Sequence, residues 1–302
     1  MDFDLTKDLN IFDDFFSKRP EVSKENFKND LKRYFLPFAK KLIDLKSKKN
    51  STDGLIVGIS AIQGAGKTTQ GEILEILFKY LGYSTISLSI DDHYLTHQEL
   101  SDLRAKDPRY IRRGVTHDIP LAIKNLTDLK KMKSGQEVQI PVYDKGAKHG
   151  DGDRVGFKKV SEKPDFIFYD GWMLGARPVA DESIFESGLP ALDTKEHIQF
   201  AKDINKKLKD YENLWDLIEF MNVLYVKNYQ ISLQWRDQAE EVLRAKGEGM
   251  SKEQIKEFVY YFWRSVHPAI QIKNLSEDST YTNQVVIIND DHSVGEILTL
   301  KR

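Results

Sequence analysis

Residues 58–70, GISAIQGAGKTTQ, place small residues, one lysine and two threonines directly after an apolar run. The usual phosphate-binding pattern is G-x-x-x-x-G-K-[ST], in which backbone N–H groups cradle phosphate oxygens. Gly66, Lys67 and Thr68 fit this pattern, whereas Ala61 takes the place of its first glycine. The stretch therefore predicts a site for nucleotide phosphates, with an ordinary glycine turn as the alternative.

The chemistry expected of this loop is that of ATP binding. Glycine lets a phosphate approach the backbone closely, and the start of a helix adds partial positive charge. Lys67 is expected to act on the β- and γ-phosphates, and the Thr68 hydroxyl to bind Mg²⁺. The residues expected to contact ATP are Gln63, Gly64, Ala65, Gly66, Lys67, Thr68 and Thr69.

Two aspartates follow the apolar run at 84–90. A carboxylate at the carboxyl end of a parallel strand faces the crevice in which ligands bind. We expect Asp91 to be the catalytic base that accepts the proton of a substrate hydroxyl, and Asp92 to bind Mg²⁺ or to position the loop. The alternative is that both cap a helix that begins near Thr96.

A third aspartate, Asp170, ends the apolar segment at 165–171. Nucleotide-binding proteins with a phosphate loop often hold their metal with an acid at such a strand end. Asp170 is therefore expected to complete a magnesium site with Thr68 and Asp92. The alternative is a simple turn residue beside Gly171.

The elements that must position these residues alternate between strands and helices. Residues 67–82 have helical periodicity and end at Gly82, a plausible helix stop. The alternation predicts βαβ units and a largely parallel sheet. The expected strands are 54–60, 84–90, 165–171, 222–228 and 284–290.

The chain is expected to divide near residue 50. Residues 1–50 predict a helical N-terminal extension, and residues 51–302 predict the nucleotide-binding domain. Residues 141–156 are rich in glycine and charge and are expected to form an excursion near the site.

Composition narrows the class of protein. Lysine and arginine number 45 against 47 aspartate and glutamate residues, which disfavours a nucleic-acid or membrane-surface partner. There are no cysteines, so disulfides and thiolate chemistry are excluded. No apolar stretch is long enough to cross a bilayer. We expect a soluble cytoplasmic protein that acts on a small molecule, while no feature indicates its oligomeric state.

Five segments together resemble the D-glycerate 3-kinase family: SIDDHYL, RGVTHDIPLA, IPVYDKGAKHGDGDR, YDGWMLGARPV and QWRDQAE. This family belongs to the P-loop kinases, with uridine kinase, phosphoribulokinase and bacterial pantothenate kinase. The phosphate loop and DDHY are typical of the whole superfamily, whereas DGWMLG with YDK and QWR points to glycerate kinases. The resemblance covers about residues 50–302. Members often have Glu at the position of Asp170 and Phe at that of His93.

The resemblance implies ATP-dependent phosphorylation of D-glycerate to 3-phosphoglycerate, a photorespiratory salvage step. With the pattern of elements, it predicts a three-layer α/β P-loop kinase with a mostly parallel sheet, a helical N-terminal extension and a small lid at about 230–247. The alternatives are a kinase of another small acceptor, such as uridine or pantothenate, and an ATP-binding regulatory protein without kinase activity. A regulatory protein need not keep Asp91 or Arg236, so their presence favours an enzyme.

A small carboxylate acceptor needs fixed cations and hydrogen-bond donors around it. Arg113 and Lys145 are candidates by charge, and the resemblance implies that the His117–Asp118 segment lines the acceptor site. For each cation the alternative is a solvated surface charge, and for Tyr143 it is a place in the core. The expected substrate-binding residues are Tyr94, Arg113, His117, Asp118, Tyr143 and Lys145.

Arg236 in QWRDQAE matches the arginine of the lid helix that closes over the transferring phosphoryl group in the related kinases. We therefore expect it to be catalytic. The alternative is a surface ion pair with Glu240, four residues further along the helix. By the same resemblance, residues 289–292 are expected to border the adenine.

Overall fold

Five parallel strands and one antiparallel strand form the central sheet of the computed structural model, which describes residues 4, 7–245, 247 and 249–301. The strand order is β2-β5-β1-β6-β7-β8, and only β8 runs antiparallel to its neighbour. The strands are β1 (Leu55–Ala61), β2 (Thr85–Ser89), β5 (Phe166–Gly171), β6 (Phe220–Tyr225), β7 (Gln284–Ile288) and β8 (Val294–Thr299). All five predicted strands are present, with their ends shifted by a few residues.

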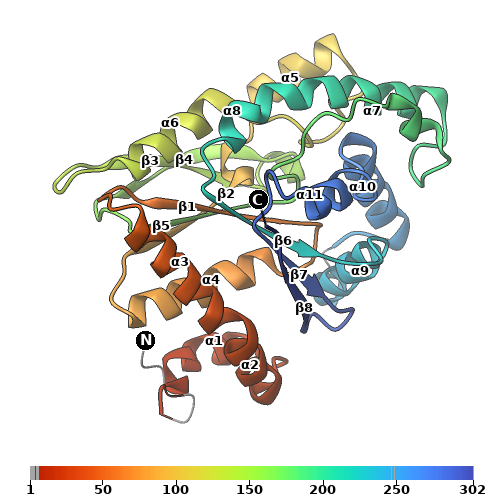
Figure 1. The fold of residues 1–302 in the computed structure, drawn as a ribbon. Coiled ribbons are helices and arrows are strands. Elements are labelled where there is room, and N and C mark those ends of the chain that lie inside the picture. The colour runs from red at the N-terminus through yellow and green to blue at the C-terminus, as the bar shows by residue number, and fades with distance from the viewer. Residues whose placement is uncertain (1–3, 5–6, 246, 248, 302) are drawn as a thin grey trace.

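Helices cover both faces of the sheet (Figure 1). Helices α3 and α4 lie on one face, and α6 and α8 lie on the other. The predicted three-layer α/β fold with a mostly parallel sheet is therefore confirmed. These four helices are α3 (Leu36–Lys48), α4 (Lys67–Tyr80), α6 (Ile119–Lys130) and α8 (Glu212–Trp215). Two further helices are α5 (His97–Lys106), which follows β2, and α7 (Lys195–Lys207), which follows β5.

The glycine-rich excursion at 141–156 is part of a β-hairpin. Strands β3 (Val138–Asp144) and β4 (Asp153–Val160) pair antiparallel, with an irregularity between Val142 and Tyr143. The loop between them includes residues 145–152. The hairpin therefore forms a second, two-stranded sheet that stands apart from the central one.

The described residues before position 50 are largely helical. Helices α1 (Asp13–Lys18) and α2 (Lys24–Asp30) lead through a π-helical turn into α3. Their apolar side chains belong to the same hydrophobic core as the sheet, and the Tyr34 hydroxyl accepts a hydrogen bond from Asn222 Nδ2 of β6 at 2.8 Å. The division of the chain at residue 50 stays a prediction.

Helices α9 (Ile231–Arg244), α10 (Lys252–Ser265) and α11 (Gln271–Glu277) follow β6 and lie together beside the end of the sheet (Figure 1). Helix α9 falls within the predicted lid at 230–247, of which residue 246 lies outside the described residues. In the part of the chain that the structure describes, no helix is long and apolar enough to span a bilayer.

Candidate active site

The phosphate loop joins β1 to α4 as its sequence predicts. Gly64 and Gly66 both have φ of 84°, a conformation that side chains rarely adopt, and Gly66 is the N-cap of α4. Ala61 ends β1 in extended backbone, so this position does not require glycine. The loop therefore has the backbone conformation that a phosphate cradle needs, despite its departure from the usual pattern.

Lys67 folds back under this loop. Its Nζ donates hydrogen bonds to the carbonyl oxygens of Ala61, at 3.1 Å, and Ile62, at 2.9 Å. Burial lowers the pKa of Lys67, while the carboxylates of Asp170 and Asp91 act in the opposite direction. The ammonium group thus lies between the loop and the two predicted acids, where phosphate charge would be placed.

The two aspartates of DDHY have different surroundings. Asp91 Oδ2 accepts a hydrogen bond from Lys145 Nζ at 2.6 Å, and among the described residues its buried Oδ1 has no partner. Asp92 Oδ2 accepts from the Ser89 backbone N–H at 2.9 Å and caps a short 3₁₀ helix, Ile90–His93. Asp91 Oδ1 is thus open to a ligand, although the neighbouring Tyr94 hydroxyl also acts on this carboxylate. Asp92 holds the start of the 3₁₀ helix that carries both aspartates.

Burial acts to raise the pKa of Asp91, but Lys145 outweighs this effect, and the pKa lies below its ordinary value. Asp91 is therefore a carboxylate at neutral pH. Helix α5 is capped by the side chain of Thr96 itself, which accepts a hydrogen bond from the Glu99 backbone N–H. Neither aspartate of the pair is needed as the cap of that helix.

Asp170 is the penultimate residue of β5, and its carboxylate acts on Lys67 of the phosphate loop. Its Oδ1 accepts a hydrogen bond from Ser89 Oγ at 3.3 Å, and burial raises its pKa to about 6. A nearby cation would favour the charged form of this carboxyl group. No group of three or more acidic or histidine side chains in the described ranges is close enough to hold a metal alone. Magnesium often binds through one or two carboxylates with phosphate and water, so the chemistry of Asp170 suits such a site. The magnesium site of Thr68, Asp92 and Asp170 stays a prediction.

The acceptor side of the site is built around a stacked pair. The rings of Tyr94 and His117 lie 4.3 Å apart at 20°, and a single β-bridge joins the two residues. The Tyr94 hydroxyl accepts a hydrogen bond from Trp172 Nε1 at 3.1 Å. His117 Nε2 is buried and has no partner within the described part of the chain. Two predicted substrate residues are therefore in contact, and one presents an unpaired polar atom.

The loop of the β3–β4 hairpin contacts both predicted cations: it carries Lys145, and its backbone binds Arg113. Lys145 reaches Asp91, whereas the Arg113 Nη1 donates to three backbone carbonyl groups of the hairpin loop. The Arg113 guanidinium lies 5.9 Å from the centre of the Tyr94 ring and 5.8 Å from that of Tyr143. Arg113 therefore shapes the loop that carries Lys145, and its contact with a substrate stays a prediction.

Asp118 has a partner at each carboxylate oxygen. Oδ1 accepts from the Leu121 backbone N–H at 3.1 Å and caps α6, and Oδ2 accepts from Arg154 at 3.1 Å. These contacts make Asp118 a positioning residue for the segment that carries His117. Direct contact between Asp118 and a substrate stays a prediction.

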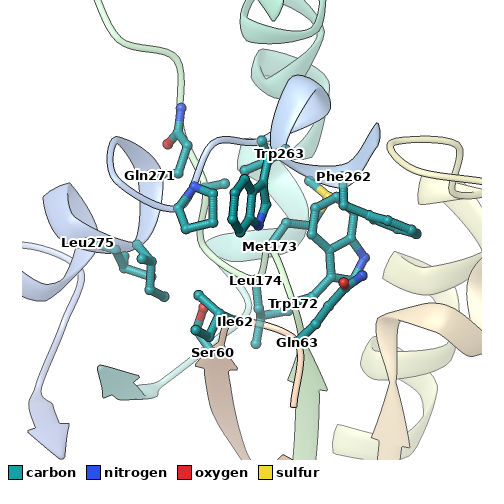
Figure 2. A pocket seen from close by; sticks show the side chains of 14 residues that line it. Ser60, Ile62, Gln63, Trp172, Met173, Leu174, Phe262, Trp263, Gln271 and Leu275 are labelled. Atoms are coloured by element: carbon teal, nitrogen blue, oxygen red, sulfur yellow. The ribbon is translucent and has the colours of Figure 1, made fainter. Parts of the chain in front are cut away.

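An apolar pocket lies beside the start of the phosphate loop (Figure 2). Trp172 and Met173, after β5, line it together with Phe262 of α10. The space that a water-sized molecule can occupy is about 20 Å³, which holds roughly one water molecule. None of the predicted substrate-binding residues lines this pocket.

Arg236 forms the ion pair with Glu240 that was the alternative to a catalytic role. Its Nη2 forms an ion pair with Glu240, which is buried, and its guanidinium lies 4.9 Å from the centre of the Phe258 ring. Glu240 also accepts from the Met250 backbone N–H at 2.9 Å. The pair with Glu240 engages Nη2, and the structure places no phosphoryl group beside the other donors of this guanidinium, so the catalytic role of Arg236 stays a prediction.

A contact that the sequence does not indicate joins the phosphate loop to residues 289–292. His292 Nε2 donates to the Gly64 carbonyl oxygen at 2.9 Å, and its ring stacks on Trp235 at 4.2 Å. Trp235 Nε1 donates to the Asp290 carbonyl oxygen at 3.1 Å. We call this arrangement of Gly64, Trp235, Asp290 and His292 the loop clamp.

Tyr211 was also missed by reasoning from the sequence. It lies in KDYENLWD, which has no motif, and its one signal is an aromatic residue four positions before Trp215. The two rings stack at 5.4 Å, as this helical spacing predicts. Tyr211 is fully buried and contacts His117.

Similarity to known proteins agrees with this geometry. Residues 56–232 match the Phosphoribulokinase / Uridine kinase family. The chain is 33% identical over 216 residues to the chloroplastic D-glycerate 3-kinase of Arabidopsis thaliana, a match that covers 68% of this chain and 45% of that protein. The match thus spans less than half of the length of the Arabidopsis relative.

Two further relatives match over most of their length. The uncharacterized kinase mug58 of Schizosaccharomyces pombe is 31% identical over 235 residues, 74% of this chain and 84% of that protein. The solved structure of a D-glycerate 3-kinase from Cryptococcus neoformans has a TM-score of 0.78 and 26% identity, over 88% of this chain and 98% of that one. The protein therefore belongs to the phosphoribulokinase/uridine kinase family of P-loop kinases.

Proposed function

We propose that this kinase transfers the γ-phosphoryl group of ATP to D-glycerate and forms 3-phosphoglycerate, with Mg²⁺ as its cofactor. The observation that carries the proposal is the small polar site beside Lys67, in which Asp91 Oδ1 and His117 Nε2 are buried without partners and Lys145 supplies a cation. The two relatives that are named D-glycerate 3-kinases support this choice of acceptor.

The site residues have complementary tasks in this proposal. Lys145 and His117 bind oxygens of the acceptor, and the charge of Lys145 favours a carboxylate. Asp91 orients the acceptor hydroxyl and takes its proton. Lys67 stabilises the negative charge of the phosphates, and Mg²⁺, when held at Thr68 and Asp170, neutralises part of the same charge. Phosphoryl transfer depends mainly on such positioning and charge stabilisation.

The acceptor can be identified by following ADP formation with MgATP. We expect D-glycerate to stimulate ADP release at least ~10-fold more than L-glycerate, uridine or pantothenate, since a site that pairs with specific oxygens strongly rejects acceptors that leave them unpaired. The Lys67→Ala protein, prepared in the same way, corrects for contaminating ATPases. Equal turnover with uridine or pantothenate would reassign the acceptor, and no stimulation by any of them would favour a regulatory protein.

Arg236 can be tested as a lid residue that acts on the transition state. We expect Arg236→Ala to lower kcat by roughly 10²-fold or more, while ATP binding to the open enzyme changes little. Turnover and nucleotide binding should be measured separately, together with thermal stability.

The matched control for Arg236 lies on the same helix. Arg244 Nη2 forms an ion pair with Asp237 at 2.7 Å, and its Nη1 donates to the Met250 carbonyl oxygen at 2.8 Å. Arg244→Ala therefore also removes a guanidinium and an ion pair from α9, together with this contact to the chain after the helix. We expect this variant to keep its turnover. If both variants lose only thermal stability, Arg236 serves its pair with Glu240 and has no part in catalysis.

A further inference from the structure

The Tyr211 hydroxyl contacts the Nδ1 side of the His117 ring. Its oxygen is 2.8 Å from His117 Nδ1 and also accepts the His117 backbone N–H at 3.4 Å. Tyr211 is 0% exposed and His117 is 7% exposed, so solvent does not compete for these contacts. In the described chain no other group forms a hydrogen bond with this hydroxyl. Its hydrogen therefore has one available acceptor, the lone pair of Nδ1.

The protonation states follow from burial. Burial raises the pKa of Tyr211 well above its ordinary range, so the phenol keeps its proton. Burial lowers the pKa of His117 to about 3, so its imidazole is neutral at pH 7 and carries one hydrogen. If that hydrogen were on Nδ1, two N–H groups would point at the phenol oxygen and the phenol hydrogen would be buried without an acceptor. Each tautomer leaves one buried donor unpaired, either the phenol O–H or the Nε2–H. The Nε2–H belongs to a ring on which the Asp91 carboxylate acts, and an oxygen of a bound acceptor can pair with it, whereas the phenol O–H has no acceptor besides Nδ1. The hydrogen therefore belongs on Nε2.

The ring cannot easily exchange its two nitrogens by turning over. One face of His117 stacks on Tyr94 at 4.3 Å, and the Tyr211 ring meets it edge-on, at 86°. The charged or titratable groups that act on His117 are Asp91, which raises its pKa, and His93 and Lys207, which lower it. Among the described residues Nε2 is the ring nitrogen left without a partner, and the carboxylate of the predicted base, Asp91, acts on this ring.

We propose that Tyr211 is a positioning residue that holds His117 in its Nε2–H tautomer, so that His117 donates a hydrogen bond to an oxygen of the acceptor. In this state the one lone pair of His117 is on Nδ1, where it accepts the Tyr211 hydrogen, so it is not available to the acceptor's proton. Proton removal is therefore left to Asp91. An anionic oxygen, such as that of a carboxylate, is the strongest partner for this N–H. The assignment of the acceptor rests on the proposed function, whereas the tautomer does not.

The tautomer can be measured without any substrate. In protein labelled with ¹⁵N-histidine, His117 should show a protonated Nε2 and an unprotonated Nδ1, and its signals are assigned by their loss in His117→Gln. In Tyr211→Phe the Nδ1 signal should shift and protonation should divide between the two nitrogens. A protonated Nδ1 in the unaltered protein overturns the proposal, as does an unchanged His117 spectrum in Tyr211→Phe.

Kinetics test whether Tyr211 acts through His117. We expect Tyr211→Phe to raise the KM for D-glycerate roughly 5- to 10-fold, with a smaller change in kcat, because one buried hydrogen bond is lost. In the His117→Gln background, the same substitution should have almost no further effect on KM. Equal KM effects of Tyr211→Phe in both backgrounds would contradict the proposal.

Tyr34→Phe is the matched control, since it removes a buried hydroxyl that bonds Asn222 far from His117 along the chain. It should leave both the His117 spectrum and the KM unchanged. If D-glycerate proves not to be the acceptor, the NMR result still decides the tautomer. The failure of one proposal can therefore be told from the failure of the other.

Discussion

Lys67→Ala is expected to reduce phosphoryl transfer by at least about 10²- to 10³-fold, the range found when one preorganised donor to developing charge is removed. Lys67 is the cation that the structure places between the phosphate loop and the two acids Asp91 and Asp170. Its Nζ also bonds two loop carbonyl groups, so ATP affinity should fall as well. ADP formation and ATP binding check the two effects separately.

Lys41→Ala is a suitable control for this change. Lys41 is also a partly buried lysine, and its Nζ donates to Gln284 and Thr299 at 3.0 Å each. It lies on α3, away from the phosphate loop in the sequence, and should affect stability only. Near-normal turnover of the Lys67→Ala protein would mean that residues 58–70 form a turn without a role in phosphate binding.

Asp91→Asn is expected to lower kcat for D-glycerate by about 10²- to 10⁴-fold, the usual effect of losing a general base. The substitution keeps the size of the side chain but removes its charge and its basicity. Because Lys67 and Thr68 are unchanged, ATP binding should be largely intact. Lys145 loses its charged partner as well, so the KM for the acceptor is expected to change.

Asp92→Asn is the control within the same motif. The asparagine side-chain oxygen can still accept the Ser89 N–H that Asp92 holds, so the 3₁₀ helix should keep its cap. We expect only a small effect on turnover, or an altered dependence on Mg²⁺. If Asp92→Asn is the more damaging change and Asp91→Asn stays active, the roles of the two aspartates are reversed.

The central sheet could be predicted from the sequence because its five parallel strands are short apolar runs, and the segments between them have the periodicity of helices. The β3–β4 hairpin was expected only as an irregular excursion, since seven of the eight residues of β4 are charged, glycine or exposed. β8 was missed for a similar reason. It is an edge strand, and the side chains of Glu296, Leu298 and Thr299 are exposed, so no buried pattern marks it.

The residues of the candidate site could be predicted where a sequence motif fixes the backbone. They were harder to predict where their role depends on contacts between residues far apart in the sequence. The phosphate loop and DDHY predicted Lys67 and Asp91 in their observed places. Arg113 was predicted from its charge and Asp118 from the family resemblance, and neither kind of reasoning tells which hydrogen-bond partners these side chains already have. Tyr211 reaches His117 across 94 positions of the chain, a distance over which a single sequence gives no signal.

The loop clamp has a consequence for the entropy of ATP binding. A phosphate loop that is disordered before its ligand arrives must lose conformational freedom on association, and this loss weakens affinity. Here the Gly64 carbonyl is held by His292, and Trp235 lies so close to Gly64 that an added Cβ would be 2.9 Å from its own Cβ. The loop's freedom is thus lost during folding, and ATP meets a preorganised surface whose rigidity comes from residues more than 150 positions away in the chain.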